Sequence, residues 1–213
     1  MGLNSSVDLA NFDPFATINS STATDAAKET ALLVQAAAAK VANLFVQTAA
    51  VSSAATSSTT ANAVADAFAS LATTLAATSS GTTVDLSDAA TVASVISSAL
   101  QTSATNQGVT LDSATISSFA SATSTVTAAN NLQVDTAVSG GGSVLARLTT
   151  TVQVQIVAQS SAATALATGA TSGDFTAATT DFTGDSLITV ISTTTVSDAN
   201  GDGHTYWDSH AHS

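Results

Sequence analysis

The chain has 213 residues, no cysteine and a net charge of −12, from 15 acidic and 3 basic side chains. The lack of cysteine excludes a disulfide scaffold and a cysteine-ligated metal site, and three cations are too few to neutralise a phosphate backbone, so we expect no nucleic-acid partner. Charged residues make up only 8% of the chain, which is too few acids, bases and cations for an ordinary catalytic site, and we expect a protein that is not an enzyme.

The acidic side chains are of one kind. Glu29 is the only glutamate, and every other acid is an aspartate. Aspartate favours helix caps and turns, whereas glutamate is at ease inside helices. We therefore expect the carboxylates at helix ends or on metal ions, and not along helix faces.

The first part of the chain predicts an irregular segment followed by a long helix. Residues 1–23 contain the only proline, Pro14, and show no periodicity. Thr24 or Asp25 can cap a helix that runs to about Ala50. Apolar or small residues recur along it at helical spacing: Val34, Ala38, Val41, Phe45 and Thr48.

The middle of the chain predicts three more helices, after a polar break at 52–60 and a loop at 79–83. Asp85 or Ser87 can cap the second of these helices, Gly108 can end it, and Asp112 or Ser113 can open the third. Each has an apolar stripe at helical spacing. The stripes are Val64, Phe68, Leu71 and Leu75; then Ala89, Val92, Ile96 and Leu100; then Ile116, Phe119, Thr123 and Val126.

Residues 134–142, which include three consecutive glycines, predict a flexible linker. A longer helix is expected over 143–167, although the alternation of β-branched residues at 151–157 is also typical of a strand. Short helices are expected at 172–180 and 186–191, and 193–196 can be extended. The fold class is therefore all-α, with five or six helices in a bundle over 24–192, a possible subdivision at 134–142, and a separate tail at 193–213.

Two further observations concern ligands and membranes. The most apolar run, 31–46, is interrupted by polar residues and is shorter than the roughly 20 apolar residues that a spanning helix needs, so we expect no transmembrane segment.

The tail begins with the oxygen-ligand spacing of a calcium loop, and Gly203 permits its turn. The twelfth loop position is Ser209 in place of a bidentate acid, so a turn that binds nothing stays an equal alternative. The predicted Ca²⁺ ligands are Asp198, Asn200, Asp202, His204 through its carbonyl, and Asp208.

Several stretches resemble an alanine-rich helical module of giant secreted bacterial surface proteins that also carry cadherin-like or RTX-type calcium-binding repeats. The resemblance is carried by 2–16, with Val7-Asp-Leu and Phe12-Asp-Pro14 its most specific part, and by 38–47, 158–167 and 182–185. It implies a fragment of a longer extracellular protein, and a structural or interaction module that contacts neighbouring modules, other surface proteins or copies of itself.

Two other functions remain open on the sequence. One is a small-ligand-binding domain with a pocket between the helices that carry Phe45, Phe68 and Phe119. The other is a subunit of an extracellular filament or ordered layer, held together by faces of alanine and valine.

Overall fold

The computed structural model describes residues 8–9, 11–79 and 82–196, and every regular element within them is helical. The predicted all-α class is confirmed. Four long helices are α2 (Asp25–Thr56), α3 (Thr60–Ala77), α4 (Ala89–Gln107) and α5 (Ser113–Ser139). A fifth consists of α6 (Val144–Val157), the π-helical segment η1 (Ala158–Ala162) and α7 (Ala163–Ser172) without a break, and the short helices are α1 (Pro14–Asn19), α8 (Thr176–Asp181) and α9 (Gly184–Thr193).

The expected number of five or six helices is not confirmed. The described residues form eight, when α6, η1 and α7 count as one. Part of the difference is α1, which lies in the segment that we expected to be irregular. Its start has two local signals: Asp13 Oδ1 accepts a 3.0 Å hydrogen bond from Ala16 N, and Pro14 takes the first helical position, where its missing N–H costs nothing.

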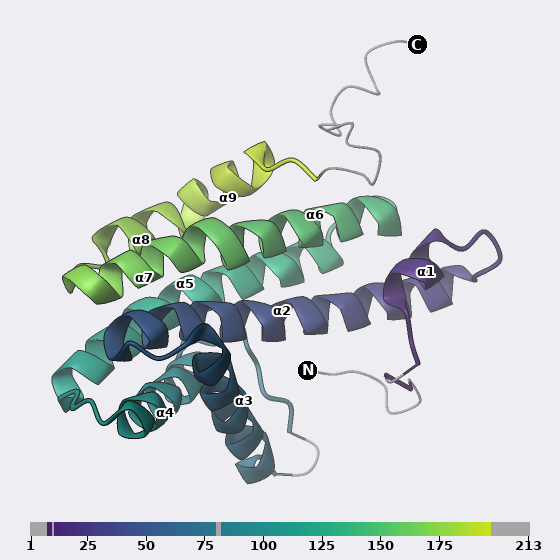
Figure 1. Cartoon of the computed structure of the whole chain (residues 1–213). Helices are drawn as coiled ribbons and strands as arrows, with labels where there is room; N and C mark the ends of the chain where they lie inside the picture. Colours follow the sequence, from purple (N-terminus) through teal and green to yellow (C-terminus); the bar gives the residue numbers. More distant parts are fainter. Residues whose placement is uncertain (1–7, 10, 80–81, 197–213) are drawn as a thin grey trace.

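The bundle is built around α2, which runs along the length of the molecule (Figure 1). It packs against α5 and against the continuous α6–η1–α7 helix, while α3 and α4 cover its C-terminal half and α1 crosses its N-terminal end. Hydrogen bonds from Asn43 to Asn131 and from Thr127 to Gln47 show that α2 and α5 are antiparallel. The helices α8 and α9 lie on the outer side of the α5–α6 pair.

The core combines large apolar side chains with many alanines. Alanines such as Ala31, Ala39 and Ala49 are fully buried on α2, and small side chains let neighbouring helix backbones approach closely. The large residues that are completely enclosed are led by Leu32, Leu44, Leu86, Ile96, Leu100, Leu166 and Leu187. Larger aliphatic side chains and alanines therefore share the core.

The predicted apolar stripes were buried to different degrees. On α4 and α5 most of the stripe is in the core, including Ile96, Leu100 and Phe119. On α3 the stripe predicted the helix correctly but is only partly buried, because Phe68 is 62% exposed and Leu71 is buried. The helix packs mainly on α2 and α4, and its buried face consists of Ala63, Asp66, Ala67, Ser70 and Leu71.

Two predicted boundaries need correction. The linker expected at 134–142 is mostly helical, because Val134 and Ala137 are buried and hold the last turns of α5 in place. Only the glycines at 140–142 lie outside the helix. The possible strand at 151–157 is a helix. Its buried residues Thr151, Val154 and Val157 recur every three residues, which is the spacing of a helix face and not of a strand.

Most of the described carboxylates lie at helix ends, as predicted. Asp13, Asp88 and Asp112 are N-caps that accept hydrogen bonds from the first turns of α1, α4 and α5. Thr24 caps α2 as expected, whereas the cap of α4 is Asp88 in place of the predicted Asp85 or Ser87. Two aspartates depart from the rule and lie inside helices, Asp66 in α3 and Asp135 in α5.

The turn and cap carboxylates predict how stability depends on pH. Hydrogen bonds from the Thr91 hydroxyl and backbone lower the pKa of Asp88, those from Thr115 lower the pKa of Asp112, and those from Thr176 lower the pKa of Asp174. A carboxyl whose folded pKa is lowered stabilises the fold above its ordinary pKa near 3.8 and ceases to do so as the pH falls through the folded pKa.

We therefore expect thermal stability to fall below about pH 4, and to fall less steeply in the triple variant Asp88→Asn/Asp112→Asn/Asp174→Asn. Asparagine keeps the capping oxygen but does not titrate. Melting curves between pH 7 and pH 2.5 measure this. Parallel pH profiles for the two proteins would contradict it.

Candidate docking groove and buried polar network

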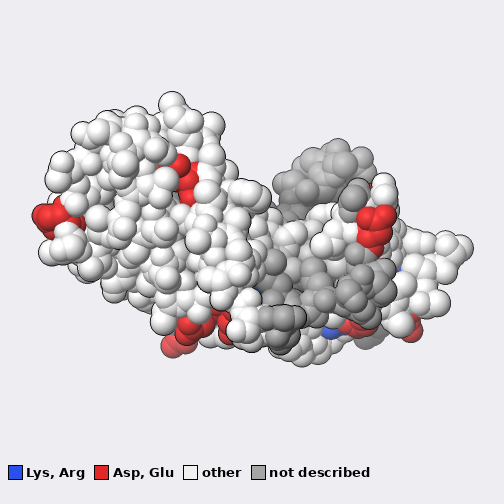
Figure 2. Space-filling view, turned by 90° about the horizontal axis from the view of Figure 1, so that it is seen from below, with Lys and Arg blue, Asp and Glu red and all other residues white. Residues whose placement is uncertain are grey.

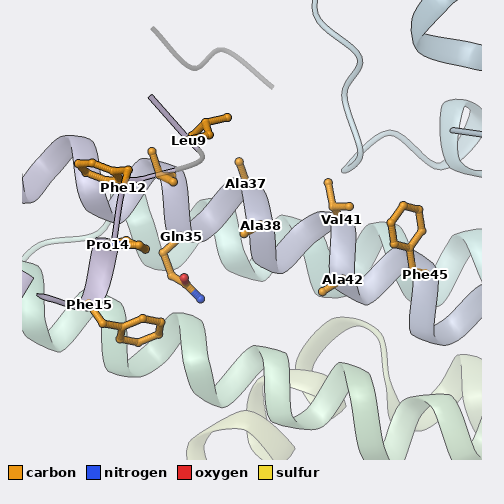
Figure 3. Close-up of a pocket in the computed structure, with 11 residues that line it drawn as sticks. Leu9, Phe12, Pro14, Phe15, Gln35, Ala37, Ala38, Val41, Ala42 and Phe45 are labelled. Atoms are coloured by element: carbon orange, nitrogen blue, oxygen red, sulfur yellow. The ribbon is translucent and has the colours of Figure 1, made fainter. Parts of the chain in front are cut away.

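An apolar groove of about 590 Å³ lies along α2. Figure 3 shows α1 and the residues before it at one end, and α2 along the floor. Among the described residues no charged side chain lines it. The lining residues are Leu9, Phe12, Pro14, Phe15, Val34, Gln35, Ala37, Ala38, Val41, Ala42 and Phe45.

The floor of the groove is the stripe that the sequence marked on the first long helix. Ala38 is exposed, whereas Val41 and Phe45 are half-buried and also pack against the edge of the main core. At the far end Phe45 contacts Phe68 of α3, with ring centroids 5.9 Å apart. The spacing predicted a helix face correctly, but periodicity alone does not say whether another element covers that face.

Among the described residues, the single polar side chain that lines the groove is already paired. Gln35 Nε2 donates to Gln155 Oε1 of α6 at 3.3 Å. In the view of Figure 2 the acidic side chains form separate groups among uncharged residues. The described lining can therefore bind apolar groups and offers no acid, base or cation for chemistry.

On its inner side α2 carries a buried network of amide side chains. Asn43 Nδ2 donates to Asn131 Oδ1 of α5 at 3.2 Å, and Gln159 Nε2 donates to Asn43 Oδ1 at the same distance. Asn131 Nδ2 in turn donates to the carbonyl of Leu86 at 2.8 Å. Asn43 and Asn131 are fully enclosed, so these bonds join α2, α5, η1 and the loop before α4 inside the protein.

The π-helical segment takes part in the same network. Gln47 Nε2 of α2 donates to the carbonyl of Ala158 at 3.0 Å, and Gln47 Oε1 accepts a 2.6 Å bond from the Thr127 hydroxyl. A π-segment changes the i→i−4 ladder of a helix and frees carbonyls for such partners. The network fixes the axial positions of three helices, which uniform alanine faces would leave poorly specified.

An ion pair extends the network toward the surface. Lys40 Nζ lies 2.7 Å from Asp135 Oδ1, and the Ser87 hydroxyl donates to Asp135 Oδ2 at 2.5 Å. Both carboxylate oxygens are engaged, which accounts for Asp135 inside a helix. A second pair joins Glu29 of α2 to Arg147 of α6. These contacts tie α2 to its neighbours.

The structure describes the residues of one predicted site but not those of the other. The predicted calcium ligands Asp198, Asn200, Asp202, His204 and Asp208 lie outside the described residues, and among the described residues no three His, Asp or Glu side chains converge. Of the three phenylalanines expected around a pocket, only Phe45 lines the groove. Phe119 instead packs edge-on against Phe175, with centroids 5.2 Å apart.

The length and apolar composition of α2 were compared with those of a membrane-spanning helix. In the part of the chain that the structure describes, it alone is long and apolar enough by length and composition to cross a membrane, and half of its most apolar window is buried inside the protein. The core helix of a soluble protein passes the same test.

Comparison of the chain with models of protein families, with curated proteins and with solved structures finds no match in any of the three.

Proposed function

We propose that this chain is a non-enzymatic interaction module of an extracellular, multidomain, calcium-binding bacterial surface protein. The observation that carries the interaction role is the open, uncharged groove along α2, with Phe15 43% and Leu9 57% exposed at its rim. Contiguous exposed apolar surface of this kind is typical of protein interaction sites, and exposed aromatic side chains are frequent binding anchors.

The partner is a neighbouring module of the same parent protein or of another surface protein, and it presents an apolar helix or segment. Ala38 and Ala42 on the floor permit close approach, while Phe15 and Phe45 provide the walls. The low content of basic residues and the aspartate-rich composition support an extracellular location, in which calcium is plentiful. In that environment a calcium-bound loop at 198–208 would stabilise the junction between modules.

The groove variant Ala38→Arg tests this function. It places a charge in the groove at an exposed helical position and should leave the fold intact. We expect it to weaken binding to the modules encoded beside this chain by about 10-fold or more, since burying an unpaired charge is costly. Isothermal titration, with calcium and with EDTA, measures the affinity.

The matched control is Ala177→Arg, an exposed alanine on α8 away from the groove, which should bind as the wild type does. Equal affinities for the two variants would contradict docking in the groove. Affinities that are the same in calcium and EDTA, together with an unaffected Asp198→Ala/Asp202→Ala variant, would contradict the calcium part alone.

A second candidate is binding of a small apolar ligand in the same groove, because about 590 Å³ lies within the usual range of ligand pockets. Native mass spectrometry of the purified chain would show a co-purified mass, and Ala38→Arg would remove it.

A further inference from the structure

Asp66, in the middle of α3, is a buried carboxylate with one oxygen that has no partner. The residue is only 8% exposed. Its Oδ1 accepts a 3.0 Å hydrogen bond from Asn106 Nδ2 at the end of α4, whereas its Oδ2 is enclosed and makes no hydrogen bond. Buried charges are normally paired or bound to a metal, so this oxygen requires an explanation.

No lysine or arginine of the chain compensates this charge. The sequence has three such residues, and all of them lie in the part that the structure describes. Lys40 pairs with Asp135 and Arg147 with Glu29. Lys28 lies in the first turn of α2 and is far from Asp66. Phe68, two residues after Asp66 on α3, contacts Phe45 of α2. Phe45 is 17 residues, or about 25 Å, along α2 from Lys28.

Further hydroxyl groups lie at the end of α4 that carries Asn106 and at the end of α2 that packs against it. Ser103 precedes Asn106 by one turn on α4, and its hydroxyl lies 3.1 Å from Thr56 Oγ1 at the end of α2. The hydroxyls of Ser52 and Ser53, in the same last turns of α2, are also buried without partners. The C-terminus of α4 adds the negative end of a helix dipole. The electrostatic field at this junction therefore favours a positive charge.

We propose that the junction of α2, α3 and α4 binds a hard cation, sodium or calcium, with Asp66 Oδ2 as its charged ligand. Hard cations prefer carboxylate, amide, hydroxyl and backbone carbonyl oxygens, and the helix ends that meet at this junction carry groups of these kinds. The bound ion neutralises the buried carboxylate and joins the three helix ends. This site is separate from the loop at 198–208 and does not depend on the function proposed above.

Thermal unfolding of the full chain tests the site. The solvents are tetramethylammonium chloride, whose cation is too large to enter, and NaCl or CaCl₂ at the same ionic strength and pH 7. The background is Asp198→Ala/Asp202→Ala, which removes any contribution of the predicted loop. We expect sodium or calcium to raise Tm by roughly 2–4 °C in a saturable manner, and the arm with the larger rise identifies the ion. Asp66→Asn, a neutral isostere, should abolish the difference between solvents.

The control variant Asp185→Asn removes an exposed carboxylate of α9 and should keep the full cation response. Calorimetric titration of the same background with the effective salt should show one ion bound per chain, a readout that does not require Asp66→Asn to fold. Equal Tm values in all three salts, or a response that survives in Asp66→Asn, would overturn the proposal.

Discussion

Replacing Asn131 with alanine is expected to lower the free energy of unfolding by about 3 kcal/mol, because each buried polar group left without a partner costs about 1–3 kcal/mol. The substitution removes the donor to the Leu86 carbonyl and the acceptor of Asn43 Nδ2. Both groups are then enclosed without water. For a chain of this size the corresponding fall in Tm is roughly 6–12 °C.

Chemical denaturation and calorimetry measure this effect. The neighbouring Leu132→Ala is the matched control, because Leu132 is 54% exposed and its truncation should change the free energy of unfolding by less than about 0.5 kcal/mol. Similar stabilities for the two variants would mean that the amide network does not hold the bundle together.

Gly169→Ala is expected to destabilise the protein although alanine is the better helix former. A Cβ atom at Gly169 of α7 would lie 2.6 Å from a ring carbon of Phe175, far inside van der Waals contact. The gain in helix propensity is about 1 kcal/mol, whereas overpacking of a core costs about 1–3 kcal/mol. Phe175 is itself held against Phe119 and cannot easily yield, so we expect a net loss of about 1–2 kcal/mol.

A double-mutant cycle with Phe175→Leu separates the clash from other effects. The smaller side chain should recover most of the loss caused by Gly169→Ala, and the two substitutions should be strongly coupled. Gly141→Ala serves as the control, because a Cβ atom there meets nothing within 4 Å. A Gly169→Ala protein as stable as the wild type would show that Phe175 has room to move.

The groove shows what periodicity can and cannot predict. The spacing of Val34, Ala38, Val41 and Phe45 predicted a helix, and the structure confirms it. The same spacing is compatible with a covered or an open face, because it records which residues share a side of the helix and not what packs on that side. The exposure of Phe68 has the same origin, since α3 has neighbours on one side only.

Asp66 and Asp135 illustrate a second limit. Aspartate in a sequence favours caps and turns, and Asp13, Asp88 and Asp112 follow that preference through hydrogen bonds to the first turn of their own helices. The two exceptions depend on residues far away in the chain: Asp135 on Lys40, 95 positions away, and Asp66 on Asn106, 40 positions away. No local pattern reports such contacts.

By itself the sequence determined the all-α class, the positions of the long helices and several of their caps, because these depend on interactions between residues three or four positions apart. It also determined that basic residues would be scarce. Only the tertiary structure decided which face of α2 is open, which amides meet inside the bundle, and where a carboxylate is buried without a cation. Those features arise when helices distant in the chain pack together, and small residues such as alanine, which dominate these faces, leave many packings equally compatible with the sequence.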